Sequence, residues 1–136
     1  MKIVIRQIHA SASKVALNQE WFVVENAGDT PFSTTGCSVS IGRGKGRPKP
    51  IGTIDPGFTL APNERVRVIT GNPGKKVHGE PPVVEGLKNY HLFLASPLLP
   101  GPGAVLAMSL HQHEITRATF DPTAKDGLSP TTNGAP

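Results

Sequence analysis

The chain lacks the cysteines that a disulfide-stapled domain needs. Its 136 residues contain a single cysteine, Cys37, which cannot form a bridge within the chain. A chain of this length can bury a two-layer core without disulfides or metals. The lone thiol therefore indicates a reducing, intracellular compartment.

Long apolar runs are also missing. Lys2 is followed by only three apolar residues before Arg6 interrupts the run. Such a run is too short for the apolar region of a secretory signal. No later stretch approaches the ~20 apolar residues of a membrane span. We therefore expect a cytoplasmic protein with no membrane partner.

The chain shows little of the chemistry that enzymes use. Its carboxylates form no close pair on one strand face, and no G-x-S-x-G nucleophile motif is present. Cys37 lies on an apolar strand face, where a thiol is inert. The sequence thus predicts no catalytic residue, no cofactor and no small-molecule substrate.

Helical periodicity is nearly absent, whereas 15 glycines and 14 prolines punctuate the chain. Short runs with alternating apolar residues lie between these breakers, which is typical of β-strands. In "CSVSI", Cys37, Val39 and Ile41 point to one face, and Ser38 and Ser40 point outward. Strands are predicted at residues 2–8, 20–26, 37–41, 65–70, 90–95, 104–110 and 114–120.

This pattern predicts an all-β domain over residues 1–120. Seven to eight short strands are the number of a small two-sheet antiparallel β-sandwich. After Phe120 the apolar pattern stops, and residues 121–136 are small, polar and rich in proline. We expect these last residues to form a flexible, disordered tail.

Two blocks carry a family resemblance. "LNQEWFVVENAGDTPFSTTGCSVS" (17–40) and "IDPGFTLAPNERVRVITG" (54–71) resemble the lamin-tail domain family. The chain departs from the family pattern at Cys37, where the family usually has tryptophan. The resemblance implies an immunoglobulin-like sandwich with no catalytic activity. It also implies a binding or scaffold module. We expect this module to act through protein–protein contacts, with a protein partner or self-association; the alternative is weak binding of DNA or another polyanion through residues 42–50.

A basic loop is the most conspicuous local feature. "GRGKGRPKP" (42–50) contains four basic residues and no acidic one. Residues 45–50 resemble an AT-hook, in which an extended Gly-Arg-Pro segment inserts arginine into a narrow A·T minor groove. Lysine stands where the motif has its first arginine, and it lacks the flat guanidinium fork. The candidate nucleic-acid contacts are Arg43, Lys45, Gly46, Arg47, Pro48 and Lys49; the alternative is a solvated loop.

Further basic residues define a secondary surface. Arg65 and Arg67 share one face of a predicted strand, and Lys75 and Lys76 follow at the next turn. They widen the basic surface if the fold brings them beside residues 43–49. Otherwise they form a solvated outer face.

Two smaller features complete the candidates. His111 and His113, two residues apart, point the same way if they lie on one strand, and they are weak candidates for metal binding. Zinc needs three or four protein ligands, so the prediction is that no metal binds. In "SPLLPGPG" (96–103), the leucines Leu98 and Leu99 either form an exposed docking loop or cap one end of the sandwich.

Overall fold

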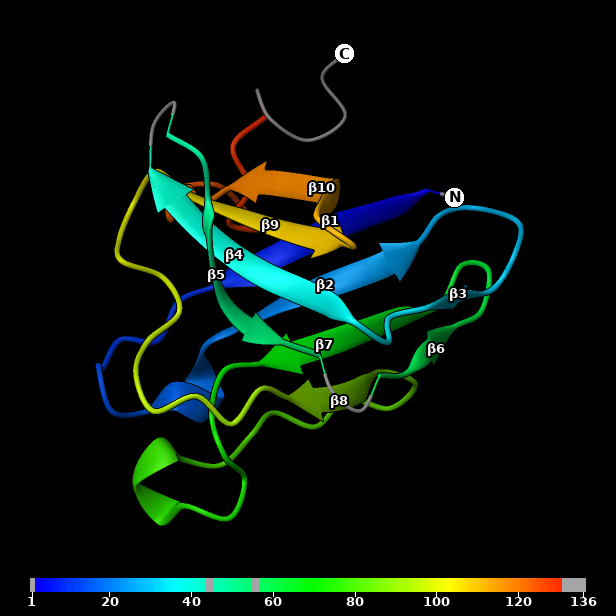
Figure 1. The fold of residues 1–136 in the computed structure, drawn as a ribbon. Coiled ribbons are helices and arrows are strands. Elements are labelled where there is room, and N and C mark those ends of the chain that lie inside the picture. The colour runs from blue at the N-terminus through cyan, green and yellow to red at the C-terminus, as the bar shows by residue number, and fades with distance from the viewer. Residues whose placement is uncertain (1, 44–45, 55–56, 131–136) are drawn as a thin grey trace.

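Two layers of β-sheet form the domain, as Figure 1 shows for a computed structural model that describes residues 2–43, 46–54 and 57–130. The first sheet has the order β1-β2-β7-β8, the second the order β10-β9-β4-β5, and a two-stranded ribbon pairs β3 with β6. The strands are β1 (Ile3–His9), β2 (Trp21–Asn26), β3 (Phe32–Ser33), β4 (Cys37–Arg43), β5 (Lys49–Thr53), β6 (Thr59–Leu60), β7 (Arg65–Ile69), β8 (Lys88–His91), β9 (Ala104–Leu110) and β10 (His113–Thr119). Two 3₁₀ turns are η1 (Leu17–Gln19) and η2 (Lys76–His78).

The prediction of an all-β sandwich is confirmed. The orders β1-β2-β7 and β10-β9-β4-β5 match the A-B-E and G-F-C-C′ strands of an immunoglobulin-like sandwich. The described residues form ten strands rather than seven or eight. The strands that the sequence pattern did not reveal are β3 and β6, of two residues each, and β5, which contains a proline and a glycine. β8 pairs with β7 in parallel rather than antiparallel fashion. Residues 70–87 supply the long connection that a parallel pair requires.

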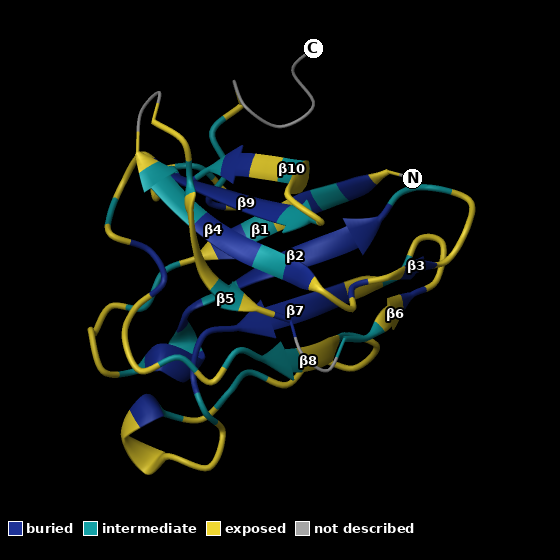
Figure 2. Ribbon diagram, in the orientation of Figure 1, coloured by how far each residue is buried: buried dark blue, intermediate teal, exposed yellow. Residues whose placement is uncertain are grey.

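Alternating side chains from both sheets build the core. Phe22 and Val24 of β2 face Val39 of β4 and Leu106 of β9, and all four are fully buried. Figure 2 shows the same distribution, with β2, β7 and β9 mostly buried, β4 a mixture of buried and intermediate residues, and β5 mostly exposed. Cys37 lies inside this core, where burial raises the pKa of its thiol. The prediction of a buried, unreactive cysteine agrees with both observations.

Leu98 and Leu99 cap one end of the sandwich. Both are buried members of the core cluster. Their backbone amides donate to the Glu20 carboxylate at 2.6 and 3.1 Å, which holds the loop in place. The alternative of an exposed docking loop is therefore wrong.

The expected disordered tail is wrong for residues 121–130. The amide of Ile8 in β1 donates to the Asp126 carbonyl at 2.9 Å, and the Ser129 amide donates to Thr119 in β10 at the same distance. Leu128 packs against the core and bridges to Phe120. This segment therefore closes the edge where β1 and β10 meet. Residues 131–136 lie outside the described residues.

Candidate nucleic-acid interface

The basic loop connects β4 to β5 at the top of Figure 1. Arg43 is the last residue of β4, and Lys49 is the first of β5. Gly46, Arg47 and Lys49 are exposed, and Pro48 is half-buried. Lys45, the residue that departs from the hook pattern, lies outside the described residues.

Two of the six residues of the hook-like stretch belong to the β-ladder. Lys49 and Pro50 pair with Ile41 and Ser40 of β4. Pro48 lies so close to Gly42 that a Cβ on this glycine would approach the Pro48 Cα at 3.0 Å. Gly46 and Arg47 are the described residues of the stretch that precede these contacts. Lys49 is therefore not free to lie along a minor groove together with them while it stays paired in the sheet.

A groove of about 540 Å³ lies beside this loop. We call this cavity the basic groove. The residues that line it are Ser38, Ser40, Arg47, Pro48, Lys49, Pro50, Ser109 and Gln112. The serines come from the outer faces of β4 and β9, because their neighbours Cys37, Val39 and Met108 point into the core. Ser40 faces outward as predicted but is only 5% exposed, inside this groove rather than in open solvent.

The polar groups of the basic groove have no protein partner among the described residues. No hydrogen bond joins the Ser38, Ser40 or Ser109 hydroxyl or the Gln112 amide to another described group, and no described carboxylate pairs with Arg47 or Lys49. Among the described residues, no carboxylate lines the groove. The surface therefore offers hydrogen-bond donors and positive charge together.

One carboxylate lies on the neighbouring strand. Glu114 of β10 is the register partner of Ser109, but both its oxygens accept hydrogen bonds from Arg117 at 2.7 Å. This contact raises the pKa of the Arg117 guanidinium. Because the pair is internally neutral, it leaves the positive potential of Arg47 and Lys49 uncancelled.

Arg67 does not belong to a basic surface, which corrects that prediction. It is 5% exposed, and its Nη1 donates to the Pro82 carbonyl at 3.1 Å and to Asn89 at 3.2 Å. Its guanidinium lies 4.9 Å from the centre of the Trp21 ring, an arrangement that stabilises a desolvated cation. Burial lowers the pKa of this guanidinium. Segment 79–87, which follows η2, covers this face and removes Arg67 from the surface.

Arg65 is engaged as well. Its Nε donates to Glu25 at 2.6 Å, and Arg6 donates to the other oxygen at 3.1 Å. Glu25 therefore sits between two cations from the flanking strands β7 and β1. Hydrogen bonding from Arg6, and then from Arg65, holds the pKa of Glu25 below its ordinary value against the opposing effect of burial.

We expect this carboxylate to give the domain an acid-sensitive part of its stability. Because the pKa of Glu25 is lower in the folded state, its contribution is complete above about pH 4.3, the ordinary glutamate value. The contribution is lost as the pH falls through the folded-state pKa. Urea unfolding from neutral to acidic pH should show a shallower decline for Glu25→Gln than for the unchanged chain. Equal losses of stability in the two chains as the pH falls would contradict this role of Glu25.

Lys75 and Lys76 lie far from the basic groove. Both are exposed at η2, at the bottom of Figure 1, whereas the β4–β5 loop lies at the top. The secondary basic surface is therefore not assembled beside residues 43–49. Of its four members, Arg65 and Arg67 are engaged in the first sheet and the two lysines occupy the opposite end of the molecule.

The two histidines form no metal site in the structure described. His111 has φ of +51° and lies in the turn between β9 and β10, so it does not share a strand face with His113. Within residues 2–43, 46–54 and 57–130, no group of three His, Cys, Asp or Glu side chains could hold a metal ion. The prediction that His111 and His113 point the same way from one strand is thus wrong, because the hairpin turn begins at His111.

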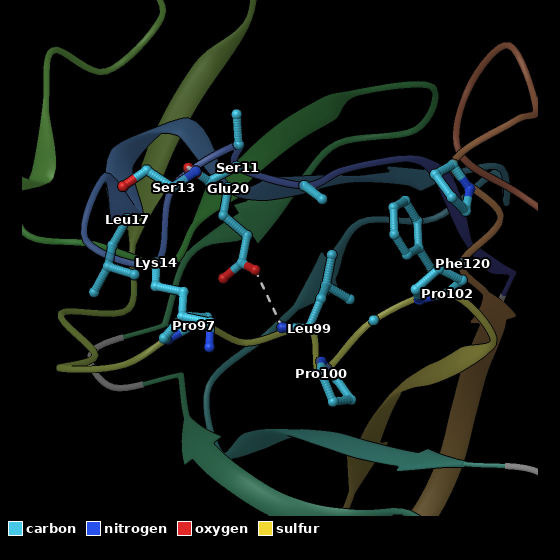
Figure 3. A pocket seen from close by; sticks show the side chains of 14 residues that line it. Ser11, Ser13, Lys14, Leu17, Glu20, Pro97, Leu99, Pro100, Pro102 and Phe120 are labelled. Carbon is cyan, nitrogen blue, oxygen red and sulfur yellow. Dashed lines mark hydrogen bonds between the residues drawn. The ribbon is translucent and has the colours of Figure 1, made fainter.

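A second cavity, of about 610 Å³, lies where residues 10–14 meet the proline-rich loop 97–102. Figure 3 shows its apolar lining, which includes Leu17, Leu99 and Phe120, and the Glu20 carboxylate directed at the Leu99 amide. Both Glu20 oxygens already accept backbone hydrogen bonds. The carboxylate of this cavity therefore serves to position the loop.

Comparison with known proteins found no relatives. A scan against protein-family models and a search of curated proteins both gave no match. Over the described residues, no helix has the length and apolar character needed to cross a membrane.

Sequence reasoning missed part of the basic groove. Ser38 and Ser40 are recognisable as outward-facing residues, but nothing local links them to Ser109 and Gln112, which lie some seventy residues later in the chain. The pairing of β4 with β9 makes that link by placing Ser109 directly opposite Ser38. The alternation in "AVLAMSL" (104–110) carries the only usable signal, since it marks Ser109 as outward-facing.

Proposed function

We propose that this domain is a non-catalytic binding domain for a polyanionic macromolecule, and that it binds through the basic groove and the adjoining β4–β5 loop. The observation that carries the proposal is the composition of the groove. Of the residues that the structure describes, two cations and four neutral polar residues line it, and no carboxylate does. Cations without acidic neighbours attract polyanions over several ångströms and steer their approach.

The other arginines support this choice of surface, because most of them are already engaged within the fold. Arg6, Arg65 and Arg117 pair with carboxylates, and Arg67 is buried. Arg47 and Lys49 are thus two of the described cations that remain available to a partner. Arg43 adds a third exposed cation at the end of β4.

A non-catalytic role is proposed because three of the described acidic groups are held by contacts within the fold. Glu20 binds two backbone amides, Glu25 binds two arginines and Glu114 binds Arg117. General acid–base catalysis needs such a group free to exchange a proton with a substrate. We also propose a cytoplasmic location, consistent with the single buried thiol.

Nucleic-acid binding is the direct test. Removing the two groove charges in Arg47→Gln/Lys49→Gln should weaken binding to a short labelled duplex at low salt by about ten-fold or more. If the four loop cations each neutralise one phosphate, the log–log salt slope of the unchanged chain is about −3.6, and the double variant should lose about 1.8 of it. Fluorescence anisotropy at several salt concentrations measures both quantities.

Lys75→Gln/Lys76→Gln is the matched control. It removes the same charge from the opposite end of the molecule, so it should change affinity by less than roughly two-fold. Equal losses in the two double variants would indicate attraction by net charge alone and would contradict a defined site. Absence of duplex binding by the unchanged chain would reject the function proposed.

A protein partner is the second candidate. Val83 and Val84 are 88% and 50% exposed at a tip held in place by its neighbours. The Pro82 carbonyl accepts from Arg67 and Asn89, and the Leu87 amide donates to Val84. A fixed apolar tip suits a protein–protein contact, including self-association. A chain that stays monomeric at high concentration in equilibrium sedimentation would exclude self-association through this tip.

Lamin-tail membership is proposed alongside this function. It rests on residues 17–40 and 54–71, and the immunoglobulin-like strand order is compatible with it. The proposed binding site does not depend on that membership, since it rests on side chains and not on the fold.

A further inference from the structure

The basic groove combines three serine hydroxyls, one side-chain amide and two cations on the outer face of the second sheet. Ser38 is the register partner of Ser109 across β4 and β9, so their Cβ atoms lie about 5 Å apart. Ser40 lies two residues further along the same face of β4, roughly 7 Å from Ser38. The hydroxyls therefore form a compact triangle rather than a scattered set.

The positive charges lie at the side of this triangle. Pro50 of β5 is the register partner of Ser40, and Lys49 and Arg47 precede it along the rim. The groove thus has a neutral hydrogen-bonding floor and a cationic wall. Charge complementarity selects an anion, and several donors around it favour a group with more than one exposed oxygen.

A phosphodiester group fits these requirements. It presents two anionic oxygens, which accept from serine hydroxyls, amides and guanidinium groups in most protein–nucleic acid interfaces. The side chains on the floor are short, so a sugar-phosphate strand can approach the sheet closely.

We propose that the basic groove binds phosphodiester groups of a nucleic-acid strand through Ser38, Ser40 and Ser109 together with Arg47 and Lys49, and that this contact reads the backbone rather than the bases. The inference rests on the proposed function and adds the hydroxyl floor and the mode of recognition. Lys49 and Pro50 are paired in the β-ladder and Pro48 lies against Gly42, so this segment is held in the sheet and is not free to insert into a minor groove. Backbone contacts carry no sequence information, so A·T-rich and G·C-rich duplexes should bind equally.

The test separates hydroxyls from charges. Ser38→Ala/Ser109→Ala changes two half-buried surface residues and leaves the core untouched. We expect this variant to bind a short labelled duplex roughly ten-fold more weakly, with a salt slope equal to that of the unchanged chain, because hydroxyls release no counterions. Adding Ser40→Ala should weaken binding further, and circular dichroism shows whether each variant folds.

A Thr59→Ala variant serves as the control. Thr59 is an exposed hydroxyl residue on β6, outside the basic groove, and its loss should leave affinity within two-fold of that of the unchanged chain. The A·T-rich and G·C-rich duplexes, and an acidic polypeptide (polyglutamate), are titrated under the same conditions.

The outcomes discriminate between the two proposals. If the Arg47→Gln/Lys49→Gln variant loses binding but the serine variants do not, the hydroxyl floor is overturned and the function stands. A marked preference for A·T-rich duplex would overturn backbone reading. Tighter binding of polyglutamate than of either duplex would overturn the choice of a nucleic acid, and no binding to any of these probes would overturn both proposals.

Discussion

Replacing Gly127 by alanine is expected to destabilise the domain by about 2–4 kcal/mol and to release residues 121–130 from it. Gly127 has φ of +75°, a conformation that costs an L-residue roughly 1–2 kcal/mol. A Cβ at this position would also lie 1.9 Å from the Ile8 carbonyl oxygen. Because that oxygen belongs to the backbone of β1, it cannot move aside without disturbing the strand.

Urea unfolding measures the loss, and hydrogen exchange at the Ile8 amide reports the release. That amide donates to Asp126 in the closing segment, so its protection should fall when the segment detaches. Gly103→Ala is the matched control. Gly103 has φ of +81°, but no atom lies within 4 Å of the place that a Cβ would take, so only the conformational cost applies. Equal destabilisation by the two variants would show that the contact with Ile8 contributes nothing.

Replacing Glu20 by glutamine is expected to cost about 2–4 kcal/mol, the second large effect. Glu20 is 3% exposed, and its two oxygens accept from the Leu98 and Leu99 amides. Glutamine keeps the shape but replaces one acceptor by an NH₂ group, which would face an amide donor. A buried donor would then lose its partner, and the apolar cap formed by Leu98 and Leu99 would loosen.

Urea unfolding measures this loss of stability, and hydrogen exchange at the Leu98 and Leu99 amides is the local readout. Glu85→Gln is the control, because Glu85 is exposed near the valine tip and its neutralisation should alter stability by less than about 0.5 kcal/mol. Unchanged protection at both leucine amides in Glu20→Gln would contradict the positioning role of this carboxylate.

The alternation along the strands is sufficient to predict the fold class. In β4, Cys37 and Val39 face the core as their spacing indicates, and Ser38 and Ser40 take the opposite face. Local patterns report which side of a strand is buried, because the side-chain period of a strand is two. They do not report which strand pairs with which, so the parallel pairing of β8 with β7 and the groove between β4 and β9 lie beyond the sequence.

Whether a single polar residue is exposed, paired or buried is harder to predict for a related reason. Arg65 and Arg67 look alike in sequence, yet one contacts Glu25 and the other is buried against Trp21. The difference arises from segment 79–87, which covers one part of the sheet and not the other. The prediction of a disordered tail is wrong at residues 121–130 for a similar reason. Backbone hydrogen bonds hold these residues to β1 and β10, and a polar composition gives no indication of such bonds.

The closure of β1 by residues near the end of the chain has a consequence for biosynthesis. Ile8 of β1 finds its partner in Asp126, which lies far later in the chain. During translation the first strand must therefore wait, with one edge unpaired, until nearly the whole domain has left the ribosome. Contacts between such distant residues slow folding, because a long loop must close before they form. The nascent chain is thus exposed to strand-edge aggregation in the interval before residues 121–130 emerge.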